Sequence, residues 1–419
     1  MPTQANGTRV LTFILLLCLI PASEGTARPG YQGAYLFMDD YPSDVSPGWH
    51  EDVQGIAHDD QYWYITQADV DEEDECRIWR IPKGQDLSDD VGSAEVYFQI
   101  DDVYDLCLPG YRHLGDLDCY YHEGSQQTYL AVPIHDHRDP RTLPTVVAFF
   151  RCGSSGPTYL GKDFLHIEDA MSGSGWCAFD PEGNLHVPGN YGPEGLTAIF
   201  RYSINWEDLA SGSWPATNVA LDLQGHTHMY DESGTNILNI SHNQGGTFSS
   251  DGSLLFHVSG YGDGPTDDDG INVFETQTWR RVAKSNNNSG WMFGYEFHYD
   301  ISQEPQGCTY WDLDDAGAPN IPGQLHVLLL ENYYVAEPDH VFLKHYTNKI
   351  YVDHRDPPPS TGRPGDPWPT VAEAAAVAWD RSRILVSGGT YPGGFSVDNK
   401  TWIEWWKEGS VIVGSGVEP

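Results

Sequence analysis

Asp116, Asp118 and Glu304 are the carboxylates in this sequence whose positions suit acid–base chemistry, because each lies close to a glycine of a repeated pattern. One carboxyl group that gives a proton and a second that acts as base or nucleophile can cleave a glycosidic bond when the two are roughly 5–9.5 Å apart. No local motif of such an enzyme accompanies the three residues. We therefore name them as candidate catalytic residues, while the absence of a motif favours a protein without catalytic activity.

Amide and imidazole groups recur at the same place in the repeated pattern. The dipeptides Gln54-Gly55, Gln244-Gly245 and Gln306-Gly307 are three instances. The predicted ligand-binding residues are Gln54, His113, Asp116, Asn243, Gln244 and Gln306. Such a set suits a sugar, an ordered cation or bound waters. The alternative is that the recurring glutamines serve only the repeat, by satisfying backbone groups where its units meet.

One acidic segment is the candidate metal site. The run Asp263-Gly-Pro-Thr-Asp-Asp-Asp-Gly270 places the carboxylates of Asp263, Asp267, Asp268 and Asp269 among turn residues. Oxygen ligands of this kind suit a structural Ca²⁺ ion, although the spacing is not that of an EF-hand. A solvated acidic loop is the alternative, and no other cofactor is predicted.

The elements that must position these side chains are short strands in a repeat. Gly55, Gly115, Gly175, Gly245 and Gly307 lie 60 to 70 residues apart, and each is followed by apolar runs separated by turn signals. A repeat of this length built from short strands predicts an all-β fold, a β-propeller over residues 28–349. We expect five blades, with Ala34-Tyr-Leu-Phe37 supplying the outer strand of the last one. A sixth blade is the alternative, because Trp291-Met-Phe-Gly-Tyr295 is another strand-like run.

The pattern changes near residue 350. Residues 350–369 are rich in Pro and Gly, which is typical of a linker. Thr370 and Glu373 then form a capping box ahead of an Ala-rich segment, which predicts a single capping α-helix. Strand-like runs follow within residues 370–419, including Arg383-Ile-Leu-Val-Ser387 and Val411-Ile-Val413.

Residues 350–414 resemble the N-terminal cap and first rungs of pectin-lyase-like right-handed parallel β-helices. The segments that carry the resemblance are Ile350-Tyr-Val-Asp353, Pro369-Thr-Val-Ala-Glu-Ala374, Arg383-Ile-Leu-Val-Ser-Gly-Gly-Thr-Tyr391 and Gly409-Ser-Val-Ile-Val-Gly414. The resemblance implies a partial β-helix of one or two rungs and a polysaccharide context. It supplies no catalytic residue, because that family's catalytic groups come from later rungs.

The chain begins with a predicted secretory signal. Residues 1–27 combine Arg9, an apolar core from Val10 to Ile20 and the small residues Gly25-Thr-Ala27, which predicts cleavage near Ala27 and a secreted or periplasmic protein. The apolar core is too short to span a bilayer. Six cysteines then remain, and an even count in an oxidising compartment favours disulfides, with buried free thiols as the alternative.

The net charge of −39 disfavours nucleic acid and anionic lipid as partners. Together these features predict an exported propeller that binds or organises a partner in a polysaccharide context, without membrane insertion. A glycan-active hydrolase or lyase that uses carboxylates at the propeller mouth is one alternative. A platform for an extracellular protein is the other.

Overall fold

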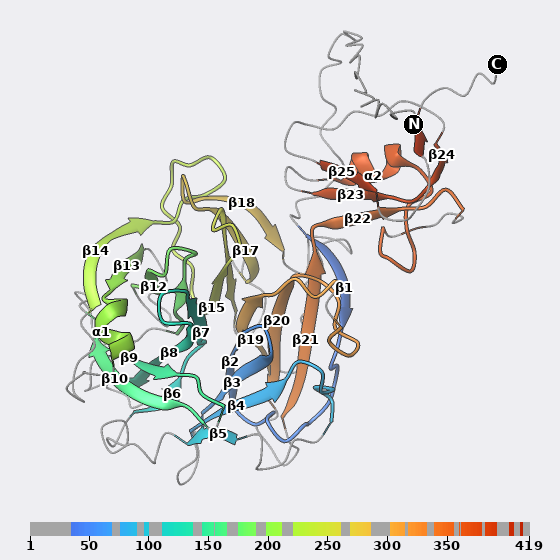
Figure 1. Cartoon of the computed structure of the whole chain (residues 1–419). Helices are drawn as coiled ribbons and strands as arrows, with labels where there is room; N and C mark the ends of the chain where they lie inside the picture. Colours follow the sequence, from blue (N-terminus) through green and yellow to red (C-terminus); the bar gives the residue numbers. More distant parts are fainter. Residues whose placement is uncertain are drawn as a thin grey trace, which may run out of the picture. The chain divides into compact units, whose positions relative to one another are not determined.

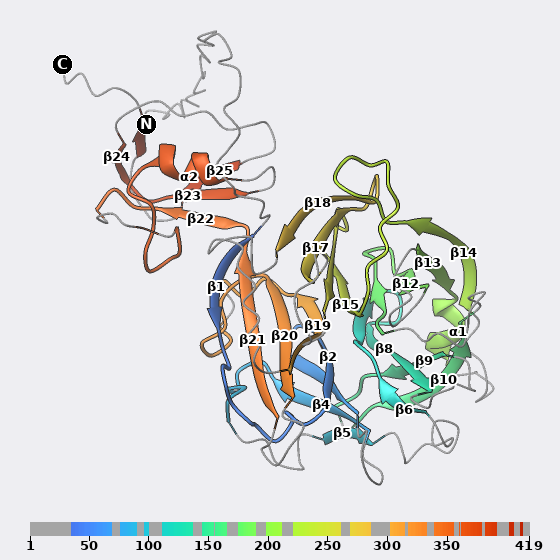
Figure 2. The ribbon, with the colours of Figure 1, turned by 180° about the vertical axis from the view of Figure 1, so that it is seen from behind.

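The structure is a computed structural model. It describes residues 35–68, 76–89, 96–99, 111–136, 145–154, 156–165, 175–189, 198–211, 221–260, 269–285, 302–314, 317–332, 339–355, 360, 362–378, 382–391, 402–405 and 411–413. Five antiparallel sheets make up a five-bladed propeller, which confirms the predicted all-β class and blade number (Figures 1 and 2). The predicted strand-like run at 291–295 lies outside the described residues.

Each blade is a sheet of antiparallel neighbours. The first contains β2 (Val53–His58), β3 (Tyr62–Gln67), β4 (Arg77–Pro82) and β5 (Val96–Gln99). The second contains β6 (Tyr111–Leu114), β7 (Asp118–His122), β8 (Gln127–Asp136), β9 (Val146–Arg151) and β10 (Thr158–Phe164). Its inner edge is divided, since β6 and β7 both pair with β8.

The third blade contains β11 (Ala178–Phe179), β12 (Leu185–Pro188), β13 (Ala198–Ile204) and β14 (Leu221–His228). The fourth contains β15 (Asn243–Phe248), β16 (Leu254–Ser259), β17 (Gly270–Glu275) and β18 (Arg280–Ser285). The fifth contains β19 (Ser302–Tyr310), β20 (Leu325–Asn332) and β21 (His340–Thr347), with β1 (Leu36–Asp40) as its outer strand.

Strand β1 closes the ring. It pairs antiparallel with β21, so that Leu36 lies opposite Thr347 and Asp40 opposite Lys344. An N-terminal strand that completes the last blade covers a sheet edge that would otherwise carry unpaired backbone groups. The prediction that the segment around Ala34–Phe37 supplies this strand is thereby confirmed.

An apolar core lies between every pair of neighbouring blades, five clusters in all. Alternate residues of one strand contribute to different clusters. On β8, Tyr129 and Ala131 pack toward the third blade, whereas Leu130 and Val132 pack toward the first. Because both faces of the middle strands are buried, their sequences are nearly continuous apolar runs rather than alternating ones.

Two predictions about local structure need correction. Among the described cysteines, Cys119, Cys152, Cys177 and Cys308 are free thiols, so the disulfide prediction is wrong for these four. Cys177 and Cys308 lie in different blade cores, as the alternative of buried thiols anticipated. Cys107 lies outside the described residues.

The single-helix prediction is also wrong, because the described residues contain two helices. The additional helix is α1 (Trp206–Ser211), whose first turn is capped when the Asp208 N–H donates to Asn205 Oδ1 at 3.2 Å. Six residues are too few for a helical period to show in the sequence. No helix in the described part of the chain is long and apolar enough to cross a membrane.

After the fifth blade the strands pair in parallel. Strands β22 (Lys349–Val352), β23 (Arg383–Val386) and β25 (Trp402–Trp405) form one sheet, and β24 (Gly389–Tyr391) pairs with β26 (Val411–Val413). Helix α2 (Val371–Val377) packs on β22 and β23. Thr370 Oγ1 accepts from the Glu373 N–H at 3.1 Å, which confirms Thr370 as the N-cap, and the Glu373 carboxylate contacts the Thr370 hydroxyl at 2.6 Å rather than its backbone N–H. The assignment of this segment to a β-helix stays a prediction.

Candidate functional site

Asp116 lies where the inner strands of the blades converge. It is fully buried, in the segment between β6 and β7. Its Oδ1 accepts a hydrogen bond from the Ile56 N–H at 2.9 Å, and its Oδ2 accepts from the Gly246 and Cys308 N–H groups at 3.2 Å each. One carboxylate from the second blade therefore binds the backbone of the first, fourth and fifth blades.

Backbone hydrogen bonds of Asp116 connect it to the third blade, the one blade that its carboxylate does not bind. Its N–H donates to the Gly175 carbonyl at 2.8 Å, and its own carbonyl accepts from the Cys177 N–H at 3.1 Å, which binds it to the third blade. Burial raises the pKa of Asp116 well above the usual range of a carboxyl group, and the three N–H bonds oppose that shift.

The repeat glycines allow this convergence. A Cβ atom on Gly55 would lie 2.4 Å from Asp116 Cα, and one on Gly307 would lie 2.3 Å from Asp116 Oδ1. A Cβ atom on Gly115 would lie 2.2 Å from the Gly175 carbonyl oxygen. Because no side chain fits at these positions, the backbones of the inner strands pack closely together and close the central channel of the propeller. We call this layer, formed by Gly55, Gly115, Gly307 and Asp116, the glycine level.

The recurring glutamines are β-bulge residues. The register of each inner strand shifts across the position of Gln54, Gln244 or Gln306, so that the glutamine is the extra residue before the glycine. A bulge bends a strand and re-aims the side chain that it carries. The side chains of Gln54, Gln244 and Gln306 lie at the end of the channel where the inner strands begin. We call this end the polar cup.

Gln54 and Gln244 are only 7% and 6% exposed, yet no described residue forms a hydrogen bond with either side-chain amide. A mostly buried amide without a protein partner needs water or a ligand in its place. His113 is also buried, and its ring centroid lies 4.2 Å from that of His135 on β8. The structure thus places Gln54, His113 and Gln244 at the same end of the propeller.

Asn243 belongs to the same end but has protein partners. Its Oδ1 accepts from Trp176 Nε1 at 2.5 Å and lies 3.4 Å from His257 Nε2. Burial lowers the pKa of His257 to about 3, so this imidazole is neutral. Trp176 and His257, which the sequence analysis did not name, are fully buried side chains next to Asn243. Trp176 follows Gly175 as Asp116 follows Gly115, and this shared position is the signal that could have found it.

Glu304 is the titratable carboxyl of the cup. It is 9% exposed and accepts a hydrogen bond from Gln306 Nε2 at 3.1 Å. Burial raises its pKa to about 7, and the negative charges of Asp339 and Asp52 add to the shift. A carboxyl with this pKa holds a proton for a large fraction of the time at neutral pH, so it can donate one.

Asp118 lies beyond the glycine level, at the other end of the channel. It is the first residue of β7, and its carboxylate accepts from the Phe179 N–H at 2.7 Å and the Cys119 N–H at 2.8 Å. Burial raises its pKa to about 7. Asp116 is fully buried and bound by backbone N–H groups, so it cannot share an open cleft with Asp118 or Glu304.

Of the predicted metal ligands, only Asp269 belongs to the described residues, where it is 3% exposed. Asp263, Asp267 and Asp268 lie outside them. Among the residues that the structure describes, no group of His, Cys, Asp and Glu has the arrangement of a metal site. The calcium site stays a prediction.

No protein-family model matches this chain, and no curated protein matches it. Among solved structures, it is similar to a luciferin-regenerating enzyme at 8% identity and a TM-score of 0.32, covering 70% of this chain and 76% of that one. It is similar to the GH43_1 enzyme from Xanthomonas citri complexed with xylose at 9% identity and a TM-score of 0.45, covering 72% and 88%.

It is also similar to an exo-β-1,3-galactanase from Clostridium thermocellum at 10% identity and a TM-score of 0.44, covering 74% of this chain and 63% of that one. Likenesses this distant carry no argument about activity. The cup itself presents mostly buried amides and one buried carboxyl group next to the closed glycine level.

Proposed function

We propose that the protein is an exported propeller that binds a neutral polysaccharide through its polar cup, without cutting it. The observation that carries the proposal is the pair of bulge residues Gln54 and Gln244, which are mostly buried and have no hydrogen-bond partner among the described residues. They stand above a channel that Asp116 and the glycines close.

The chemistry of the cup suits sugar hydroxyls. A primary amide offers a donor and an acceptor side by side, and a sugar presents pairs of hydroxyls that can use both. Trp176 is fully buried and, as the partner of Asn243, fixes the position of that amide, while the His113–His135 pair is buried beside it. Small-molecule sites generally combine apolar walls with a few polar groups that fix orientation.

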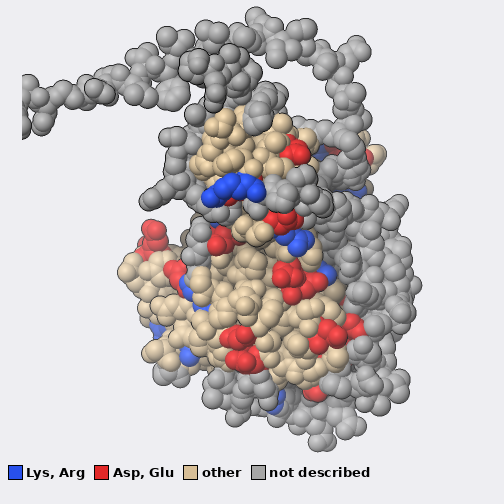
Figure 3. Space-filling view, turned by 90° about the vertical axis from the view of Figure 1, so that its right-hand side faces the viewer, with Lys and Arg blue, Asp and Glu red and all other residues tan. Residues whose placement is uncertain are grey.

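Charge narrows the ligand class. The chain carries 61 acidic residues against 22 Lys and Arg, and carboxylates are spread over the face seen in Figure 3. Such a surface disfavours an anionic polymer at low salt. We therefore propose a neutral polysaccharide rather than a uronic-acid-rich one.

Glu304 supports the alternative of a glycan hydrolase. Its raised pKa suits a proton donor, and Asp52 and Asp339 are acidic neighbours that affect its charge. Under this alternative Glu304 acts as acid and one of these carboxylates as base. Asp116 has no place in it, because the carboxylate is sealed by backbone N–H groups.

The test uses the mature chain in native gels that contain a mixed-linkage β-glucan, a xylan, an arabinan or a galactan. Retardation in at least one gel, weakened in Gln54→Ala/Gln244→Ala, is the expected result. The matched control is Gln61→Ala/Gln126→Ala, which removes two exposed glutamines from hairpin turns. If the wild type releases reducing ends and Glu304→Gln does not, the hydrolase alternative replaces the proposal of binding alone. Capture of an extracellular protein without glycan binding would favour the protein platform.

Three further proposals follow from the sequence. We propose export after cleavage near Ala27, a structural Ca²⁺ in the segment 263–270, and a partial β-helix for residues 370–419. The parallel pairing of β22, β23 and β25 supports the last. Mass spectrometry of the exported protein tests the first, and calcium-dependent melting of the wild type compared with Asp267→Asn/Asp268→Asn tests the second.

A further inference from the structure

A second recess lies between the third and fourth blades, at the end opposite the polar cup. Its volume is about 610 Å³, within the roughly 300–1,000 Å³ range of small-molecule sites. Ile199, Phe248 and Trp279 give it apolar and aromatic walls, while Arg201, Glu182 and Gln224 are among its polar residues. The combination of aromatic walls and mixed-sign polar groups points to a ligand with one apolar face and several hydroxyls.

Trp279 has an unusual backbone. Its φ is +55°, in the left-handed region, and among the described residues it is the only apolar non-glycine with a positive φ. A bulky residue in this region is strained, and the position would favour Gly or Asn. Trp279 is the last residue of the turn before β18, which begins at Arg280.

An equivalent turn shows what the position ordinarily holds. Gln126 precedes β8 as Trp279 precedes β18, and its φ is also +55°. Gln126 is exposed and polar. A tryptophan at this position raises the conformational energy of the backbone, although the turn does not require a tryptophan. Strain of this kind is concentrated at functional sites.

The indole lies beside other rings of the recess. Its centroid is 6.1 Å from that of His186, which lies 4.8 Å from that of Phe248. His186 Nε2 is 3.0 Å from Asp180 Oδ2, and Arg201 Nε is 3.6 Å from the same oxygen. Asp180 thereby neutralises Arg201 and holds it over the recess, so the site does not favour an anion.

We propose that this inter-blade recess is a second carbohydrate site, in which Trp279 stacks on the apolar face of a neutral pyranose ring and Arg201 and Glu182 bind its hydroxyls. The proposal goes beyond the polar cup and does not depend on it. Two sites at opposite ends would let one molecule hold two stretches of polysaccharide, which raises retention by avidity.

The first test compares Trp279→Ala with the wild type in the four polysaccharide gels described above. The variant is expected to lose about tenfold in affinity, because it loses an aromatic contact face. The matched control Gln126→Ala has the same φ in the equivalent turn and should bind like the wild type. Unchanged retardation of Trp279→Ala, or no retardation of the wild type in any gel, would overturn the proposal.

The second test separates ligand binding from folding. Trp279→Gly and Trp279→Ala both remove the indole, but only Gly relieves the left-handed backbone. Trp279→Gly is therefore expected to melt about 2 °C above Trp279→Ala, with equally weak binding. If Trp279→Gly melts below Trp279→Ala, the backbone is not strained there and the inference fails.

The proposals for the polar cup and for the inter-blade recess can be overturned separately. If Trp279→Ala weakens binding and Gln54→Ala/Gln244→Ala does not, the recess is the site and the polar cup is not. The reverse result would sustain the cup and overturn the recess. Weakening by both variants, with a ligand stoichiometry of two that each variant reduces to one, sustains both.

Discussion

Asp116 Oδ1 accepts a hydrogen bond from the Ile56 N–H at 2.9 Å, although the two residues are separated by 60 positions and belong to different blades. The same carboxylate binds the N–H groups of Gly246 and Cys308. The residue that acid–base reasoning selects as a candidate catalyst is therefore the point at which the blades are joined. This geometry favours a role in stability.

Asp116→Asn is expected to destabilise the protein by about 3 kcal/mol, because the amide NH₂ group would face a backbone donor and leave it unpaired. Urea unfolding measures this. The control Asp60→Asn changes an exposed acid and should remain within about 0.5 kcal/mol of the wild type. A stable Asp116→Asn variant that loses a hydrolytic activity would return Asp116 to the catalytic role.

The glycines should be intolerant of even one methyl group. Gly55→Ala and Gly307→Ala would place a Cβ atom 2.4 Å and 2.3 Å from atoms of Asp116. Overpacking on backbone atoms costs about 1–3 kcal/mol or more. Gly84→Ala is the matched control, because nothing lies within 4 Å of its Cβ position. Equal melting temperatures of all three variants would contradict a closed glycine level.

The blade count and the closing strand could be predicted from the sequence, because glycines at 60–70-residue spacing and apolar runs report local geometry. The role of Asp116 could not be predicted from the sequence. It depends on four segments from other blades meeting at one point, and spacing along the chain does not show such a convergence. One signal was present, since Asp116 is the only acid that directly follows a repeat glycine.

The glutamines show the same limit. The sequence shows that Gln-Gly recurs, but the bulge that sets Gln54, Gln244 and Gln306 out of register appears only in the strand pairing. Cysteine number likewise suggested disulfides, whereas Cys177 and Cys308 lie in separate cores. The positive φ of Trp279 is likewise not visible in its residue type.

Glu304 should make stability depend on pH. Its pKa is raised to about 7 in the folded protein, so the folded state binds its proton more tightly than the unfolded state does. This contribution is complete below the unfolded pKa and is lost as the pH rises to about 7, by on the order of 3 kcal/mol.

Glu304→Gln mimics the protonated form and lacks this dependence. Its stability relative to the wild type should therefore increase between pH 5 and pH 8, as followed by urea unfolding at each pH. Parallel stability curves for the two proteins over this range would contradict the raised pKa.

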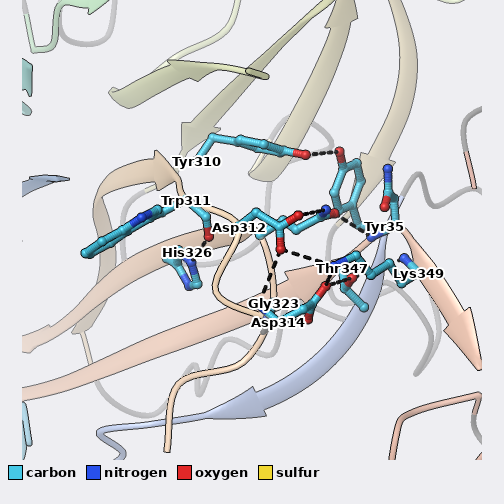
Figure 4. A network of polar contacts seen from close by, with 11 residues as sticks. Tyr35, Tyr310, Trp311, Asp312, Asp314, Gly323, His326, Thr347 and Lys349 are labelled. Atoms are coloured by element: carbon cyan, nitrogen blue, oxygen red, sulfur yellow. Dashed lines mark hydrogen bonds and ion pairs between the residues drawn. The ribbon is translucent and has the colours of Figure 1, made fainter. Parts of the chain in front are cut away.

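Lys349 connects β22 to the fifth blade through two carboxylates (Figure 4). Its Nζ lies 2.9 Å from Asp314 Oδ2 and 3.2 Å from Asp312 Oδ1, and the Asp314 side chain is 1% exposed. Asp314 also accepts from the Gly323 N–H and the Thr347 hydroxyl. Removing the lysine would leave a buried charge without its cation.

Lys349→Met should therefore cost about 3 kcal/mol in urea unfolding. Adding Asp314→Asn should recover part of the loss, because it removes the uncompensated charge, and a double-mutant cycle measures the coupling. If the two single variants are additive, the pair is not coupled and the ion pair has no part in holding β22.

The polar cup is tested most directly by calorimetric titration of the wild type with a tetrasaccharide from whichever neutral polysaccharide retards it most. Gln54→Ala/Gln244→Ala should weaken the Kd by about tenfold or more, since each lost amide removes hydrogen bonds of about 1 kcal/mol. The control Gln61→Ala/Gln126→Ala should leave the Kd unchanged. Equal Kd values for the cup variant and the wild type would contradict ligand binding in the cup.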